Sequence, residues 1–251
     1  MGDKGKVKKY ELLEREKNGL CRIRALIEIP RYHVKIGEIG GYVESELNLE
    51  HDGDCWIFDD ACAIEKANVH GNAGLFNHSV AKESSGVGGN VRLFHWAEIR
   101  DYARASMNAT LSDYACVSDS ARIYGDAEIE KQAHLTGCAS MSGHSVLSGS
   151  ATLRGNISLC EWEHIADRAI VEKDSDYCLI RLERHYDTIT LYASRNTDNT
   201  RICRVGWRRY DASFEEFWLR LRENPKISED VKTSYDIILR AGAEYILNGG
   251  R

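Results

Sequence analysis

The sequence predicts a mainly β fold. The expected core is a parallel β-helix of about six triangular coils, with an N-terminal β cap before it and a small α+β domain after it. Three observations lead there: a short, uncharged residue recurs every six positions from Cys55 to Ile157, an apolar residue follows each of them two positions later, and glycine or asparagine recurs every eighteen positions. A period of six is neither that of an α-helix nor that of a single long strand.

The six-residue repeat is very regular. Twelve of the eighteen residues at its first position are alanine, and all eighteen residues two positions later, from Ile57 to Leu159, are apolar. With 43% hydrophobic residues overall, a random sequence would reach this at odds of about one in a few million. Two inward residues separated by one outward residue define a very short strand, so each hexad supplies one strand and one corner.

Three such strands close a coil of eighteen residues, and parallel stacking of coils satisfies the backbone hydrogen bonds. Six coils at about 4.8 Å each give a rod of about 29 Å. The dipeptides before every third hexad mostly tolerate a positive φ, as a tight corner requires. They are Gly53-Asp54, Gly71-Asn72, Gly89-Asn90, Met107-Asn108, Gly125-Asp126 and Gly143-His144.

These hexads resemble the hexapeptide-repeat family, and the resemblance implies that the β-helix is left-handed. In addition, Arg22 to Leu26 (RIRAL) and Gly40 to Leu49 (GGYVESELNL) resemble the start of YdcK-like hexapeptide-repeat proteins of enterobacteria and their phages. The wider family includes acyltransferases, carbonic anhydrases and noncatalytic proteins, so the resemblance implies an architecture more firmly than an activity.

The flanking segments complete three predicted regions: a β cap over 1–50, the β-helix over 51–173 and an α+β domain over 174–251. In the cap, strand-like segments surround Gly40-Gly41, which we expect to form a turn. A cap is expected physically because an open β-helix end would expose unpaired strand edges. Glu163 interrupts the small-residue series, but the apolar spacing resumes through Val171 and predicts a partial seventh coil.

After residue 174 the sequence predicts three strands, near 178–184, 188–194 and 200–207. A first helix begins with the capping box Ser213 and Glu216 and ends at Asn224-Pro225. A second helix is expected over 228–247. Its apolar stripe is Val231, Tyr235, Ile238, Leu239 and Ile246.

Composition narrows the function classes. The net charge of −6 and the pI near 5.9 argue against direct binding of nucleic acid or an anionic membrane, which needs clustered lysine and arginine. The chain has no apolar run of membrane-spanning length and no apolar core of a signal peptide, so we expect a cytoplasmic protein. The eight cysteines show no zinc-ligand spacing and are expected to be free thiols.

Because the coil is eighteen residues long, surface columns can be found by adding eighteen. Phe58, Phe76 and Phe94 form one column, and the neighbouring corner column contains His78, Trp96 and Tyr114, with Arg92 and His95 beside them. An exposed aromatic patch of this kind usually marks an interface or a ligand groove. Three interpretations stay open: internal stacking or cover by the C-terminal domain, a homo-oligomer interface, and a site for a partner or ligand.

Other candidate sites are weaker. Arg100, Arg104 and Arg122 are a candidate anion contact, although Asp101 and Asp119 lie nearby and favour a solvated surface. The histidines His70, His78, His95, His134 and His144 have no flanking motif that identifies a catalytic base. No nucleotide-binding loop, hydrolase motif or three-histidine zinc pattern occurs, so we predict no catalytic residue, metal or cofactor.

These observations favour a non-enzymatic binding protein of phage or prophage type. Its rigid faces would engage a host protein or small ligand in the host cytoplasm, with inhibition of a bacterial defence system as one such role, and the chain would form a homo-oligomer. Two alternatives stay open: a coenzyme A-dependent acyltransferase, as the fold resemblance suggests, and a structural or scaffold protein.

Overall fold

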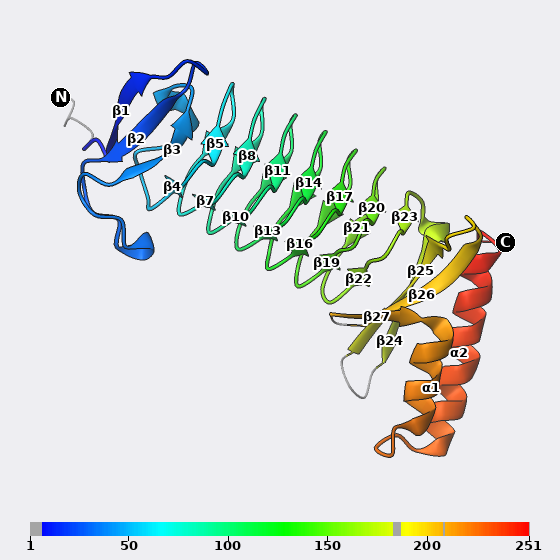
Figure 1. Cartoon of the computed structure of the whole chain (residues 1–251). Coiled ribbons are helices and arrows are strands. Elements are labelled where there is room, and N and C mark those ends of the chain that lie inside the picture. Colours follow the sequence, from blue (N-terminus) through cyan, green and yellow to red (C-terminus); the bar gives the residue numbers. More distant parts are fainter. Residues whose placement is uncertain (1–6, 183–186, 208, 251) are drawn as a thin grey trace, which may run out of the picture.

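The structure is a computed structural model that describes residues 7–182, 187–207 and 209–250. Its body is a parallel β-solenoid with the N-terminal strands at one end and the C-terminal domain at the other (Figure 1). Twenty two-residue strands, β4 to β23, lie on three faces and make close to seven coils. The predicted six coils and partial seventh are confirmed, because the sequence from Glu163 onward adds two strands to the solenoid.

The three faces contain every third strand, and we call them the first, second and third face. The first face contains β4 (Trp56–Ile57), β7 (Gly74–Leu75), β10 (Arg92–Leu93), β13 (Thr110–Leu111), β16 (Glu128–Ile129), β19 (Val146–Leu147) and β22 (His164–Ile165). The second contains β5 (Cys62–Ala63), β8 (Val80–Ala81), β11 (Glu98–Ile99), β14 (Cys116–Val117), β17 (His134–Leu135), β20 (Thr152–Leu153) and β23 (Ile170–Val171). The third contains β6 (Asn68–Val69), β9 (Gly86–Val87), β12 (Arg104–Ala105), β15 (Arg122–Ile123), β18 (Ser140–Met141) and β21 (Ser158–Leu159).

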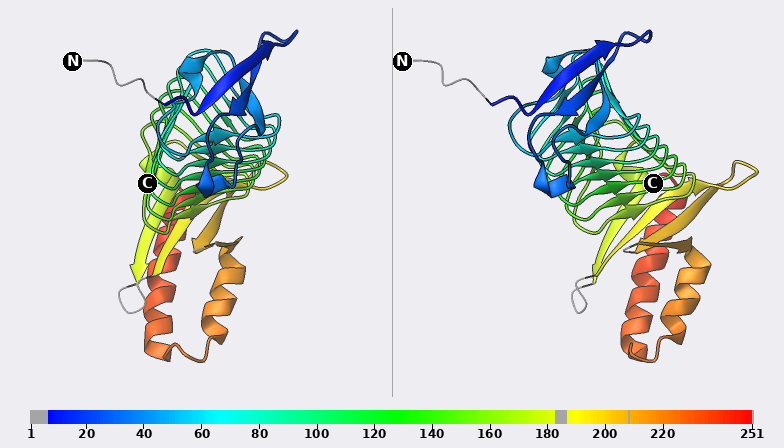
Figure 2. Two further views of the ribbon diagram at one scale, coloured as in Figure 1. Left: turned by 90° about the vertical axis from the view of Figure 1, so that its left-hand side faces the viewer. Right: turned by 60° about the vertical axis from the view of Figure 1, so that its left-hand side comes forward.

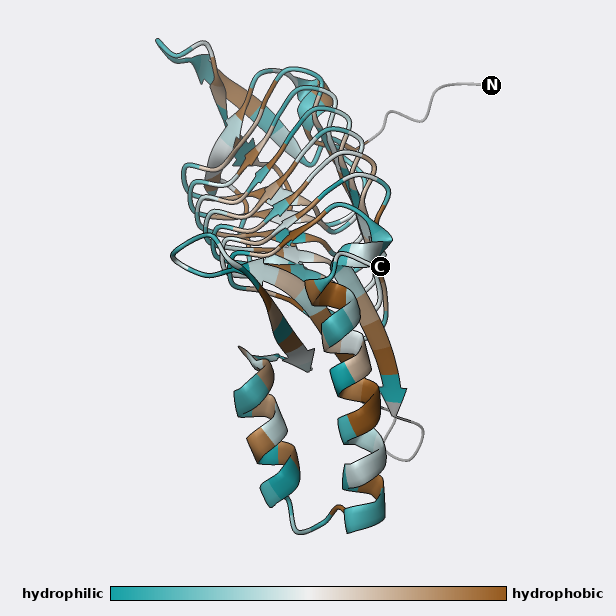
Figure 3. Ribbon diagram, turned by 90° about the vertical axis from the view of Figure 1, so that its right-hand side faces the viewer, coloured by the Kyte–Doolittle hydropathy of each residue, from teal (hydrophilic) through white to brown (hydrophobic). Residues whose placement is uncertain are grey.

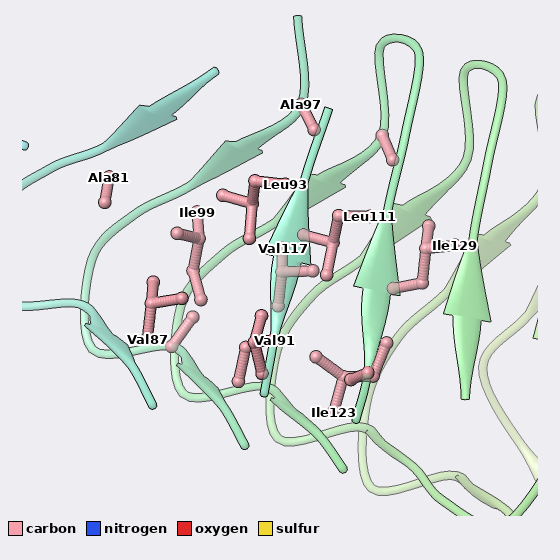
Figure 4. Packing of buried hydrophobic residues seen from close by; sticks show 14 of the residues in the cluster. Ala81, Val87, Val91, Leu93, Ala97, Ile99, Leu111, Val117, Ile123 and Ile129 are labelled. Carbon is pink, nitrogen blue, oxygen red and sulfur yellow. The ribbon is translucent and has the colours of Figure 1, made fainter. Parts of the chain in front are cut away.

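Every neighbouring pair of these strands is parallel and shifted by eighteen residues, as Leu93 opposite Leu111 illustrates. Figure 2 shows the coils from two further sides as a regular stack of similar outline. Both predicted inward columns are buried, and Figure 4 shows side chains such as Leu93, Leu111 and Val117 converging in the same interior. Small residues beside the corners and larger apolar residues at the axis fill that interior, as the spacing predicts.

The corners are stabilised by ladders that also repeat every eighteen residues. At the first corner, between the third and first faces, Asn72 donates to Asn90 (3.1 Å) and Asn90 to Asn108 (2.8 Å). The residue before each of these amides has a positive φ, and a Cβ on Gly71 would lie only 3.0 Å from the backbone nitrogen of Gly89. Glycine is therefore favoured at this column by both conformation and space, although Met107 adopts the same positive φ before Asn108.

The N-terminal cap is a three-stranded extension of the second face. Its strands are β1 (Tyr10–Arg15), β2 (Cys21–Ala25) and β3 (Ile39–Val43), and β3 pairs in parallel with β5. Gly40 and Gly41 lie inside β3, so the predicted turn is wrong. A Cβ on Gly40 would lie 2.6 Å from the carbonyl oxygen of Ile57. The two glycines are needed because this strand approaches the first coil closely.

Two polar side chains complete the closure of this end. Asn48, in the short helix η2 (Glu46–Asn48), donates to the carbonyl oxygens of Glu65 (3.0 Å) and Ala67 (2.9 Å). The fully buried Lys9 donates to the carbonyl oxygen of Gly53 at 3.2 Å. Backbone acceptors at the open end of the solenoid are thereby satisfied.

The C-terminal domain is a four-stranded antiparallel sheet with two helices. The short helix η3 (Asp174–Asp176) leads into β24 (Tyr177–Leu182), β25 (Asp187–Arg195), β26 (Arg201–Trp207) and β27 (Tyr210–Ser213), and the helices are α1 (Phe214–Glu223) and α2 (Glu229–Leu247). The predicted capping box of Ser213 and Glu216 is present. The short fourth strand was not predicted.

The apolar stripe of α2 was partly wrong. Leu239 and Ile246 are buried as expected, but Ile238 is 47% exposed. Gly242 and Ala243 are buried instead, because these small residues let the helix lie close to Leu191 of β25.

The C-terminal sheet closes the far end of the solenoid. Tyr192 of β25 is fully buried in the solenoid core, and Thr190 of the same strand accepts a hydrogen bond from the backbone nitrogen of His164 (3.2 Å). A Cβ on Gly206 would lie 1.9 Å from the carbonyl oxygen of His164, so this seam is tightly packed. Figure 3 views the molecule from this end, with the two helices extending beyond the coils.

A polar network crosses the same seam. Arg204 binds both carboxylate oxygens of Asp211 (3.2 and 2.5 Å) and lies 3.7 Å from Asp167 of the last complete corner. Ser194 donates to Asp167 at 2.8 Å. Nearby, Glu163 is 1% exposed, and its carboxylate accepts the backbone N–H of Cys160 at 2.6 Å. Burial raises the pKa of Glu163.

Candidate functional site

The three phenylalanines predicted to stack do so, at the end of the first face. The ring centroids of Phe58 and Phe76 are 4.6 Å apart with an interplanar angle of 8°, and those of Phe76 and Phe94 are 4.8 Å apart at 18°. These distances match the spacing of strands in a sheet, because each ring is carried by the same position of successive coils. We call this column the phenylalanine stack.

The phenylalanine stack is partly covered from within the chain. Tyr32, in the short helix η1 (Pro30–Tyr32), lies edge-on to Phe58 and Phe76 at centroid distances of 5.4 and 5.8 Å. Its hydroxyl donates to the carbonyl oxygen of Asn72 at 2.6 Å, and burial raises the pKa of Tyr32. The cover over these two rings comes from the N-terminal cap, whereas one of the predicted interpretations assigned it to the C-terminal domain.

The adjoining second corner, between the first and second faces, is open to solvent. His78 stacks on Trp96 with centroids 4.2 Å apart, and Tyr114 occupies the next step of the same column. Trp96 is 53% exposed and Tyr114 is 60% exposed. We call the column of His78, Trp96 and Tyr114 the aromatic edge.

The other two predicted residues lie beside these columns. The guanidinium carbon of Arg92 is 5.9 Å from the ring centroid of Phe94, and the ring of His95 lies 6.4 Å from that of Phe94. The structure therefore brings all eight residues of the predicted patch to one side of the solenoid.

Hydrogen bonds from backbone N–H groups to side chains of the preceding coil orient the polar side chains of this corner. Asn77 accepts the N–H of His95 (3.1 Å), and the Nδ1 atom of His95 accepts the N–H of Asp113 (3.3 Å). A neutral His95 then carries its proton on Nε2. Asp60 lies 3.9 Å from Nδ1 of His78 and also binds Arg22 at 2.8 Å. The aromatic edge is thus bordered by carboxylates on a corner with a fixed backbone.

The predicted anion contact divides between two faces. Arg100 lies on the second face, 3.1 Å from Glu98 and 4.0 Å from Asp101. Arg104 and Arg122 are paired in register on the third face, where they line a shallow groove of about 360 Å³. Arg104 already donates to backbone carbonyl oxygens, including that of Ser84 at 2.5 Å, so its guanidinium is largely occupied. An anion at this groove stays a prediction.

A groove that the sequence did not predict lies between the first corner and the C-terminal sheet. His144 stacks on Trp162 with centroids 4.1 Å apart, and its Nδ1 atom lies 3.7 Å from a carboxylate oxygen of Asp126. Arg209, next to β27, pairs with Glu128 of β16 across a cavity of about 380 Å³. The His144–Trp162 contact could have been found by adding eighteen, but Arg209 comes from a distant segment.

No protein-family model matches the chain, and no curated protein matches it. The resemblance to YdcK-like proteins is therefore supported only as far as the repeat architecture. No helix among the described residues is long and apolar enough to cross a membrane. Across 7–182, 187–207 and 209–250, no group of three or more His, Cys, Asp or Glu side chains is arranged to hold a metal ion.

Proposed function

We propose that this chain is a non-enzymatic binding protein that engages a protein partner through the aromatic edge. The observation that carries the proposal is the exposure of adjacent aromatic rings on successive coils: Trp96, which stacks on His78, and Tyr114 are both more than half exposed. Tryptophan and tyrosine contribute large contact areas with few rotatable bonds and are enriched among residues that dominate interface energies. A rigid β-solenoid also loses little conformational entropy on binding.

The charged residues beside the aromatic edge indicate what kind of partner surface would fit it. Asp60 and Asp113 lie beside the rings, and the chain carries a net charge of −6. A complementary surface would place an apolar group against Trp96 and a lysine or arginine near the carboxylates. A second copy of the chain and a host protein both remain within this proposal. Its phage or prophage setting, and a role against bacterial defence, rest on the sequence resemblance alone.

The test compares two exposed aromatic surfaces of the same solenoid. Trp96→Ser combined with Tyr114→Ser removes the aromatic edge, and Tyr102→Ser is the matched control, since Tyr102 is 68% exposed on the opposite side of the second face. Light scattering should give a multiple of 28.3 kDa for the wild type and the control but the monomer mass for the double variant. This result would identify a second copy as the partner.

If the wild type is a monomer, affinity capture from host bacterial cells replaces the mass measurement. A host protein retained by the wild type and by Tyr102→Ser, but lost from the double variant, supports the proposal. Equal masses and equal captured proteins for all three forms would overturn it.

A second candidate, a coenzyme A-dependent acyltransferase, is favoured by one observation. A histidine oriented by a carboxylate can act as a general base, and His144 faces Asp126 in a groove large enough for a small acceptor. Thermal denaturation with millimolar acetyl coenzyme A tests this, because a ligand that binds only the folded state raises its stability. Stabilisation that is lost in Trp162→Ala would favour the enzyme, and an unchanged melting temperature would exclude this ligand.

A further inference from the structure

The C-terminal domain contains an apolar pocket that belongs neither to the aromatic edge nor to the His144 groove. It has a volume of about 300 Å³ and lies between the four-stranded sheet and both helices. That volume is at the lower end of the range of small-molecule sites, about 300–1,000 Å³. Its walls come from strands β25, β26 and β27, from α1, and from the start of α2, so five elements define one cavity.

Aromatic rings dominate the walls. Trp207 and Phe217 meet edge to face with centroids 6.2 Å apart, and Tyr210 and Tyr235 line the pocket as well. The floor is fixed, because Ile189 is only 1% exposed and Phe217 only 5%. Rings held in this way favour a flat aromatic guest, which can make offset or edge contacts with several of them at once.

The charged groups of the pocket are cations. Arg220 and Lys226 line it together with the amide of Asn224, and no carboxylate is among its lining residues in the described part of the chain. The guanidinium of Arg220 lies 4.3 Å above the ring of Tyr210. This stacking orients the planar group while its N–H donors stay available at the edge, the geometry in which arginine binds carboxylates.

We propose that this pocket binds a small aromatic carboxylate. The ring system occupies the apolar space beside Trp207, Phe217 and Tyr235, and the carboxylate lies at the mouth, where Arg220 and Lys226 neutralise its charge. Tight binding is expected only for a ligand that fills the apolar space and also pairs with the cations at the mouth. A neutral aromatic compound forms no ion pair with the two exposed cations, and a simple anion leaves the apolar walls hydrated.

The probe is naphthalene-2-carboxylate, titrated into the full-length chain by calorimetry, with naphthalene-2-methanol as the uncharged analogue. We expect one site per chain and a dissociation constant at least about tenfold lower for the carboxylate than for the alcohol. In a nitrogen-15 spectrum, the tryptophan indole signal that is absent from Trp207→Phe should be the one that shifts on binding.

Two sets of variants locate the site. Arg220→Gln combined with Lys226→Gln should weaken carboxylate binding about tenfold or more and leave alcohol binding unchanged. Arg222→Gln, an exposed cation on the same helix, is the matched control and should bind like the wild type. Because all three side chains are exposed or at the pocket mouth, these variants should stay folded, which circular dichroism verifies.

Three results would overturn the assignment: no saturable binding at millimolar carboxylate, equal affinity for the alcohol, or carboxylate binding that survives the double variant. The outcome is independent of the proposed function, because loss of the aromatic edge leaves this pocket intact.

Discussion

The solenoid and the C-terminal domain are stabilised in different ways. In the solenoid, each coil repeats its contacts with the coil eighteen residues before and after it, and buried side chains recur in columns. In the C-terminal domain, the core joins residues far apart in sequence, such as Ile189 of β25 and Ile246 of α2. The buried columns of the periodic region can be predicted from its spacing, whereas the core and the apolar pocket of the C-terminal domain depend on contacts between residues that no spacing relates.

The largest expected effect comes from removing a buried side chain in either region. Leu111→Ala in a central coil, and Leu191→Ala in β25, should each lower the free energy of unfolding by about 3 kcal/mol because both leave cavities. Hydrogen exchange should show that the two substitutions weaken protection in different parts of the chain. Leu111→Ala should weaken protection in the coils on both sides, because each coil is stabilised by its neighbours.

Leu191→Ala should weaken protection in the C-terminal sheet and leave the central coils unchanged. If both variants change protection equally across the whole chain, the solenoid and the C-terminal domain unfold as a single cooperative unit and are not stabilised separately.

A substitution where the C-terminal sheet packs on the last coil should loosen that contact and lower the free energy of unfolding by less than the two core substitutions. Gly206→Ala places a methyl group against the carbonyl oxygen of His164 and should destabilise the protein by about 2 kcal/mol. Exchange at β22 and β25 should rise while the first coils stay protected. Ser106→Ala, at an exposed position far from this seam, is a suitable control. Wild-type protection at the seam of Gly206→Ala would contradict the packing described.

Glu163, the charged residue that interrupts the small-residue series, should make the free energy of unfolding depend on pH. Burial raises the pKa of Glu163 in the folded state above its unfolded value, so its contribution to stability is greatest at low pH and is lost as pH rises through the folded pKa. Glu163→Gln should therefore be more stable than the wild type by about 1 kcal/mol near pH 8. The difference should vanish near pH 4, and urea denaturation across that range measures it.

A difference between Glu163→Gln and the wild type that does not change with pH would exclude an ionised, buried Glu163 as its cause.

The smallest effect is expected at the corner ladder. Asn90→Ala breaks the amide contacts with Asn72 and Asn108, and should cost about 1 kcal/mol because the group is half-buried. Ser120→Ala, at an exposed position of another corner, should change the urea midpoint little. If the two substitutions cost the same, the ladder contributes nothing beyond its neighbours' backbone pairing.

The features that could be predicted from the sequence are those that repeat along the solenoid. The buried columns and the phenylalanine stack follow from adding eighteen, because every coil places equivalent side chains at the same point. Tyr32 could not be predicted as a cover, since it lies outside the repeat and reaches Phe58 only through the fold of the cap. The Gly40-Gly41 error has a similar cause. Glycine signals a turn locally, whereas here the requirement comes from the backbone of the first coil.

The pocket of the C-terminal domain was beyond sequence reasoning for the same reason. Trp207, Phe217 and Tyr235 belong to a strand and two different helices, and no common spacing relates them. The short strand β27, with its polar sequence YDAS, also carries too weak a pattern to be recognised without its partner β26.

The parallel stacking has a consequence for molecular architecture. The aromatic edge lies on the solenoid and the pocket lies in the C-terminal domain at its far end, and the solenoid between them changes length only in whole coils of eighteen residues, each about 4.8 Å. Duplicating or deleting a coil between them would change their separation by that fixed increment while preserving both sites. The number of coils in the solenoid therefore sets the distance between the two proposed sites.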